Sequence, residues 1–190
     1  MKKQKLFERG AEAVVTNSKF IHRDVVIKER IEKRYRNKNI DSMLRKSRTK
    51  AEVRLLHRAK CAGVPCPTVL CVEDFSLIMT RINGSRPRMT EAQAKMAGKY
   101  LALLHNNGVI HGDYTPANLL ASGKSLYVID FGLGFFSRDV EDMAVDVFTM
   151  LKSLKVKRRK SFLVGYRACK QYNAVIKRLD DISKRMRYAS

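Results

Sequence analysis

The sequence predicts an α+β fold in which a strand-rich N-terminal part with one helix precedes a helix-rich C-terminal part. Segments rich in β-branched residues gather before residue 30 and again at 68–82. Apolar residues at helical spacing occur mainly after residue 90. No repeat or low-complexity linker divides the 190 residues, which suffice for one compact unit or two tightly joined lobes. We expect the lobes to be residues 1–82 and 83–190, because Asn83-Gly84 interrupts the chain there.

The first strands are expected within residues 6–28, as a small antiparallel sheet. The runs LF, AVVT and DVVIK carry the β-branched residues, and breaks are expected at Gly10 and at Asn17-Ser18. The following residues, 29–50, are densely charged. We therefore expect a solvated loop with some helix in that stretch.

A helix is expected from about Thr49 to Cys61. Its face of Glu52, Leu55, Leu56 and Ala59 follows the i, i+3, i+4, i+7 spacing of a buried helical stripe. Glu52 thus points the same way as apolar side chains. A carboxylate in that position needs a cation.

The rest of the chain alternates strand and helix signals. TVLCV and SLIMTRI predict two strands, and Thr90 and Gln93 have the spacing of a capping box that opens a helix reaching His105. HGDYTPANLL then reads as a loop and SLYVID as a buried strand. Residues 139–154 predict another helix, and helical spacing returns within the basic segment that follows.

The net charge of +21 is concentrated at both ends of the chain. Residues 1–60 hold 19 Lys and Arg against 7 Asp and Glu, and residues 151–190 hold 13 against 2. Charge of this size favours a polyanion such as RNA, because bound phosphates release counterions. No apolar run is long enough to span a membrane, and no signal peptide is recognised. We therefore expect a cytoplasmic protein without a membrane partner.

Five polar residues carry the chemistry that the sequence predicts. Phosphoryl transfer needs a carboxylate to orient the attacking hydroxyl, oxygen ligands for Mg²⁺ and a cation on the phosphates. In HGDYTPANLL, Asp113 suits the first role and Asn118 the second, while Asp130 before Phe-Gly supplies another ligand. Lys28 ends a strand and can reach phosphates, and Glu52 can hold it in place. Each residue alone has an ordinary structural explanation, but the five in this order predict an ATP and Mg²⁺ site.

These motifs resemble the protein-kinase fold and, within it, the small atypical kinases of the KEOPS (EKC) complex, which makes threonylcarbamoyladenosine (t6A) in tRNA. The resemblance covers almost the whole chain. It rests on GAEA, VIKERIEKRYR, RTKAEVRLL, IHGDYTPANLL, VIDFGLG and EDMAVDV. It implies a bilobal fold, with a small β-rich N-lobe and a reduced helical C-lobe. The shortness of the chain leads us to expect an archaeal source.

The resemblance also assigns roles to residues. Lys28 would contact phosphates with Glu52 as its partner, Asp113 would be the catalytic carboxylate, and Asp146 would brace the catalytic loop. Asn118 and Asp130 would bind the metal. The remaining nucleotide contacts would come from Gly10, Ala11, Glu12 and Ala13 over the phosphates and from Met79, Thr80 and Ile82 against the adenine.

Several features depart from ordinary protein kinases. The glycine-rich loop is reduced to Gly10, so backbone cradling of phosphates should be weaker. Gly112 replaces the arginine of HRD, and Thr115 stands where many kinases have a lysine. The short connection from Phe131-Gly132 to the helix at Asp139 leaves no room for a normal activation segment with a peptide platform.

The functional prediction is an atypical Ser/Thr kinase or ATPase that regulates a partner enzyme. The resemblance implies KEOPS partners, namely the threonylcarbamoyl transferase subunit and a small regulatory subunit on the N-lobe, with tRNA on the basic N- and C-terminal segments. A RIO-type kinase of ribosome assembly is an alternative, which FGLG and ERIEKRYR fit poorly. An aminoglycoside-type phosphotransferase would need a substrate-binding insertion and an acidic pocket. A third alternative is an RNA-binding scaffold with an inactive kinase fold.

Overall fold

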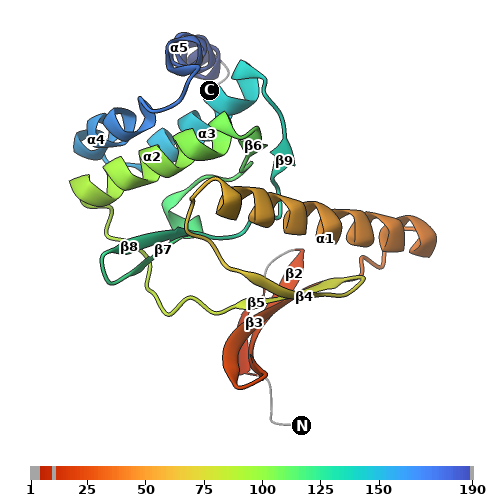
Figure 1. The fold of residues 1–190 in the computed structure, drawn as a ribbon. Coiled ribbons are helices and arrows are strands. Elements are labelled where there is room, and N and C mark those ends of the chain that lie inside the picture. The colour runs from red at the N-terminus through yellow and green to blue at the C-terminus, as the bar shows by residue number, and fades with distance from the viewer. Residues whose placement is uncertain (1–4, 10–11, 189–190) are drawn as a thin grey trace.

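A computed structural model describes residues 5–9 and 12–188 and confirms the α+β fold (Figure 1). An antiparallel sheet with one long helix is followed by a helical part. The elements are β1 Lys5–Arg9, β2 Ala13–Phe20, β3 Arg23–Arg30, α1 Lys38–Cys61, β4 Val69–Val72, β5 Ser76–Thr80, α2 Glu91–Asn106, β6 Val109–Ile110, the 3₁₀ turn η1 Pro116–Asn118, β7 Leu119–Ser122, β8 Ser125–Val128, β9 Phe135–Phe136, α3 Val140–Ser153, α4 Val156–Tyr166 and α5 Tyr172–Tyr188.

The N-terminal sheet has the strand order β1-β2-β3-β5-β4, with antiparallel neighbours. The break expected at Asn17-Ser18 is wrong, because β2 continues through these residues and pairs with β3. The chain turns at Ile21 and His22, whose φ angles of 47° and 62° suit a two-residue hairpin. Neither residue type is the usual one for such a turn, so this turn could not be predicted from its residues.

Helix α1 corrects the expectation of a loop over residues 29–50, because it begins at Lys38 with Asn37 as its N-cap. The charges of this segment are paired within the fold. Asp41 is fully buried, and its Oδ2 lies 2.6 Å from Nε of Arg45. The Arg45 guanidinium in turn lies 3.9 Å from the ring centroid of Phe75. High charge density here therefore marks a helix with paired charges.

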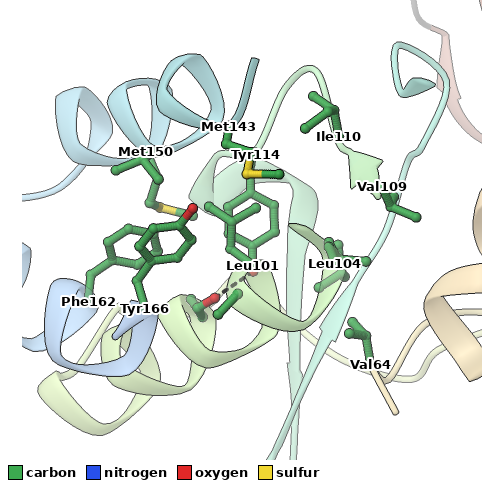
Figure 2. Packing of buried hydrophobic residues seen from close by; sticks show 14 of the residues in the cluster. Val64, Leu101, Leu104, Val109, Ile110, Tyr114, Met143, Met150, Phe162 and Tyr166 are labelled. Carbon is green, nitrogen blue, oxygen red and sulfur yellow. Dashed lines mark hydrogen bonds between the residues drawn. The ribbon is translucent and has the colours of Figure 1, made fainter. Parts of the chain in front are cut away.

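The helical part is built around one apolar core (Figure 2). Helix α2 begins with the expected capping box of Thr90 and Gln93. It crosses α4 at two glycines: a Cβ on Gly98 would lie 2.0 Å from the Phe162 carbonyl oxygen, and one on Gly165 would lie 1.9 Å from that of Lys95. The two helices can approach this closely only because both positions lack a side chain.

Two short pairings fix the chain between α2 and α3. β7 pairs with β8 and β6 with β9, so part of the segment expected as a loop is strand. Tyr114 anchors the intervening loop in the core, because its hydroxyl donates to the Ala97 carbonyl at 2.9 Å (Figure 2).

Helix α1 lies between the sheet and the helical part (Figure 1). Leu55, Leu56 and Ala59 of α1 belong to the same apolar core as the C-terminal helices. The division into lobes at residues 82 and 83 therefore stays a prediction. Over the described residues, the structure contains no helix long and apolar enough to cross a membrane.

Candidate active site

Lys28 on β3 joins the sheet to both other parts of the site. Its Nζ lies 2.6 Å from Oε1 of Glu52 on α1 and 2.8 Å from Oδ1 of Asp130. Burial alone would lower the pKa of Lys28, but the two carboxylates outweigh it and raise that pKa. Lys28 is therefore charged at neutral pH, and the predicted Lys28–Glu52 contact is formed.

Glu52 has a second cation that was not expected from the sequence. Nη2 of Arg30 lies 2.7 Å from Glu52 Oε2, and Arg30 is 5% exposed. Arg30 and Lys28 alternate with exposed Glu29 along β3, so both side chains face α1. The sequence does contain this signal, because residues two apart on a strand point to the same face of the sheet.

Glu12, expected to lie over the phosphates, is paired with α1. Its carboxylate accepts a hydrogen bond from Nη1 of Arg48 and lies 4.0 Å from Nη1 of Arg30. The hydrogen bond from Arg48 is the main cause that lowers the pKa of Glu12. Ala13 is buried at the start of β2. Gly10 and Ala11, the other two members of the predicted nucleotide turn, lie outside the described residues.

Asp113 and Asn118 are brought together by the turn η1. The Asn118 amide nitrogen donates to the carbonyl oxygen and to Oδ2 of Asp113, both at 2.8 Å. Both amide hydrogens are thus directed at Asp113. The amide oxygen of Asn118 accepts none of the hydrogen bonds identified among the described residues, and it is the type of hard oxygen donor that Mg²⁺ prefers.

Asp130 has a left-handed backbone, with φ of 60°. Such a conformation costs energy in a non-glycine residue and is common at functional sites. Its Oδ1 accepts hydrogen bonds from Lys28 Nζ and, at 3.1 Å, from the Gly132 amide. Burial alone would raise the pKa of Asp130, but Lys28 outweighs it and lowers that pKa. Asp130 is therefore an ionised carboxylate, so the donor set of Asn118 and Asp130 fits a magnesium ion.

Asp146 on α3 holds the loop that carries Asp113, as the resemblance implied. Its carboxylate accepts from the backbone amides of His111 at 2.7 Å and Gly112 at 2.9 Å. It also lies 3.3 Å from Nε2 of His105, a buried side chain that the sequence did not single out. The Nδ1 of His105 contacts the Tyr166 hydroxyl at 2.7 Å. The bracing group is therefore itself fixed by two further core residues.

His111 connects the loop to the strand end before Asp130. Its Nε2 lies 3.1 Å from the Ile129 carbonyl oxygen, and its Nδ1 accepts from the Asp113 amide at 3.3 Å. Complete burial is the main cause that lowers the pKa of His111. The neutral ring with hydrogen on Nε2 satisfies both contacts.

Gly112 replaces arginine for a backbone reason. Its φ is +79°, and a Cβ there would lie 2.3 Å from the Leu133 carbonyl oxygen. The segment after Asp130 passes this closely because β9 pairs with β6 next to the loop. That segment then enters α3 at Val140, so the chain between Asp130 and α3 holds a two-residue strand where a peptide platform would be.

The residues expected against adenine lie in the last two positions of β5 and just after it. Met79 is buried, and the Thr80 hydroxyl accepts from the Thr68 amide at 2.9 Å. Ile82 follows in the connection toward α2 and is half-buried. Their contact with a base stays a prediction.

The fold and these contacts define a phosphotransferase of the protein-kinase type. The model of the RIO domain family matches residues 11–160, and the chain belongs to this family. The judgement that the RIO pattern fits poorly is therefore wrong at the level of the family.

Two relatives and one solved structure narrow the comparison. The chain is 42% identical over 187 residues to a "Probable serine/threonine-protein kinase BUD32 homolog" of Archaeoglobus fulgidus, covering 94% of each chain. It is 37% identical to a "Probable bifunctional tRNA threonylcarbamoyladenosine biosynthesis protein" of Methanosarcina acetivorans, covering 96% of this chain and 35% of that protein. The chain thus spans about a third of that relative.

The fold also matches a solved Rio2 kinase from Chaetomium thermophilum in an ADP/Mg²⁺-phosphoaspartate complex. The TM-score is 0.65 at 13% identity, and the match covers 100% of this chain and 71% of that one. At this identity the likeness shows the fold.

Proposed function

We propose that this chain binds Mg²⁺ and ATP between its sheet and its helical part and acts as the regulatory kinase or ATPase subunit of a KEOPS-type complex in t6A modification of tRNA. The single observation that carries the proposal is the contact of Lys28 with both Glu52 and Asp130. This contact joins strand β3, helix α1 and the carboxylate that follows β8, as phosphoryl transfer requires. The names of the archaeal relatives support the tRNA process.

Each residue of the site has a stated task. Asn118 and Asp130 would hold the metal, which when bound neutralises charge on the phosphates. Lys28 would bind phosphate oxygens, and Asp113, held by Asn118, would orient the attacking hydroxyl or water. Asp146 would keep Asp113 in place through the loop backbone. The missing peptide platform favours ATP hydrolysis or slow phosphorylation of a bound partner over efficient capture of free peptides.

Partners remain part of this proposal. We infer that the chain works in the cytoplasm with a threonylcarbamoyl transferase subunit and a small subunit on the N-terminal sheet, and that tRNA contacts its basic segments. Exposed cations of α4 and its flanks, Lys155, Lys157, Arg159 and Lys160 among them, support contact with phosphates.

The test is ATP turnover by the purified chain with magnesium, alone and with unmodified tRNA and candidate partner subunits. Asp130→Asn keeps the side-chain size but removes the charge, and we expect it to abolish turnover. We expect partner subunits or tRNA to raise the wild-type rate. Magnesium-independent turnover, or turnover that Asp130→Asn leaves intact, would overturn the assignment of the site.

A second readout separates hydrolysis from protein phosphorylation. The solved Rio2 structure contains phosphoaspartate. The same reaction should therefore be run with ATP labelled at its γ-phosphate and stopped with acid, and the labelled protein should then be treated with hydroxylamine. An acyl phosphate is cleaved by hydroxylamine, whereas phosphoserine is not. Labile label supports an ATPase cycle through a carboxylate, and stable label supports a kinase.

A further inference from the structure

Two cations contact Glu52, and the second of them, Arg30, has none of the roles assigned above. Arg30 Nη2 lies 2.7 Å from one oxygen of Glu52, and Lys28 Nζ lies 2.6 Å from the other. Lys28 also contacts Asp130 at 2.8 Å. The four side chains thus form a row of alternating charge, running from Arg30 through Glu52 and Lys28 to Asp130. We call this row the charge row.

The charge row is shielded from solvent where Arg30 enters it. Arg30, Glu52 and Lys28 are each less than a tenth exposed. Charges interact strongly in such surroundings, because little water screens them. The guanidinium also reaches the glycine after Asp130-Phe131, since a Cβ on Gly132 would lie 3.8 Å from Arg30 Nη2.

The charge row explains what Arg30 contributes if Asp130 serves as a metal ligand. Its carboxylate then no longer offsets Lys28, and three members of the row remain. With Arg30 these sum to one positive charge beside the phosphates, since Glu12, 4.0 Å from Arg30, is itself paired with Arg48. Without Arg30, Glu52 would neutralise Lys28 completely. This reasoning rests on the proposed function, because it requires a nucleotide at the site.

We propose that Arg30 is a positioning residue for the nucleotide phosphates, which balances Glu52 so that the charge of Lys28 is available to them. The reduced glycine loop makes this contribution larger, because fewer backbone amides can cradle the phosphates. A purely structural Arg30 would instead only hold α1 against the sheet. The two roles differ in their expected effect on the affinity for adenosine, which has the base and sugar of ATP but no phosphate.

The experiment measures the dissociation constants of ATP and adenosine by titration calorimetry. The variant is Arg30→Gln, whose amide can still donate to Glu52 but carries no charge. Arg30→Lys restores the charge. Arg45→Gln is the matched control, because it removes another arginine that pairs with a buried carboxylate on α1, at 2.6 Å from Asp41.

We expect Arg30→Gln to weaken ATP binding about tenfold, or about 1.4 kcal/mol, and to leave adenosine binding within about twofold. Arg30→Lys should stay within about threefold of wild type for ATP, since it keeps the charge. Arg45→Gln should lower the midpoint of thermal unfolding and leave both affinities unchanged.

Three results would overturn the role of Arg30. They are an unchanged ATP affinity in Arg30→Gln, an equal loss for ATP and adenosine, and an equal loss of ATP affinity in Arg45→Gln. If Arg30→Gln does not fold, Arg30→Lys decides: a loss of ATP affinity above about threefold contradicts a role based on charge. Wild-type protein that binds no ATP would overturn the proposed function itself, and the role of Arg30 with it.

Discussion

Restoring a side chain at Gly112 should destabilise the protein more than its backbone angle alone explains. The left-handed backbone at φ +79° costs about 1–2 kcal/mol for an ordinary residue. The new Cβ would also lie 2.3 Å from the Leu133 carbonyl oxygen, and relieving such a contact costs about 1–3 kcal/mol. We therefore expect Gly112→Ala to lower the free energy of unfolding by about 2–5 kcal/mol.

Gly63 is the matched control for this prediction. It has the same φ of +79°, but a Cβ there would meet no atom within 4 Å. Gly63→Ala should thus cost only the backbone part, about 1–2 kcal/mol. The difference between the two variants isolates the contact with Leu133.

The assay is urea unfolding followed by far-UV circular dichroism, because the chain has no tryptophan. Equal losses in the two alanine variants would refute the argument that Leu133 excludes a side chain at position 112. Gly112→Arg, which restores the HRD pattern, should behave no better than Gly112→Ala. A stable Gly112→Arg protein would contradict the backbone explanation for HGD.

Three further predictions concern the supports of the site. Asp146→Asn should lower the free energy of unfolding by about 1–3 kcal/mol and slow ATP turnover, because one carboxylate oxygen that accepts from a buried backbone amide becomes an NH₂ donor. Urea unfolding and turnover assays check the two effects. Unchanged values in both would exclude the bracing role. Gly98→Ala should destabilise the protein by about 1–3 kcal/mol, since its Cβ would meet the Phe162 carbonyl oxygen. The same change in a solvent-exposed helix stabilises. A rise in the midpoint of thermal unfolding would therefore contradict the close crossing of α2 and α4. Stability should also fall on both sides of about pH 6.5. Burial lowers the pKa of His111, so its contribution to stability is complete above the pKa of the unfolded chain and is lost as pH falls. Burial alone would lower the pKa of His105, but Asp146 helps to outweigh it and raise that pKa, so this contribution is complete below the pKa of the unfolded chain and is lost as pH rises. In urea unfolding from pH 5.5 to 8, His105→Gln should flatten only the alkaline decline in stability, and an unaltered alkaline decline would refute this.

The order of the site residues was predictable because each sits in a short motif with its own local signal. Lys28 follows the β-branched run of β3, Glu52 lies on an apolar helical stripe, and Asp130 follows strand β8. Such signals depend only on neighbours along the chain. The structure brings Lys28 into contact with Glu52 and Asp130, and Asn118 into contact with Asp113. The adenine and metal roles stay predictions.

The failures came from contacts distant in sequence. The dense charge of residues 29–50 led us to expect a solvated loop with some helix. Asp41 and Arg45 pair locally within α1, but the ring that covers Arg45 belongs to Phe75, between β4 and β5. Strand β9 has two residues and exists only because β6 lies beside it. His105 gave no signal, since its importance comes from Asp146 on another helix.

Helix α1 is held by the helical core and by the sheet at the same time. Leu55 and Leu56 are buried in the core of the C-terminal helices, and each fully buried leucine contributes about 1.5–3 kcal/mol. One turn earlier, Glu52 is paired with Lys28 and Arg30 of β3. A shift of the sheet across α1 would leave the Glu52 carboxylate buried without its cations, and losing a partner from a buried ion pair costs about 3–5 kcal/mol. A ligand that separates the sheet from α1 must therefore supply new partners for these charges.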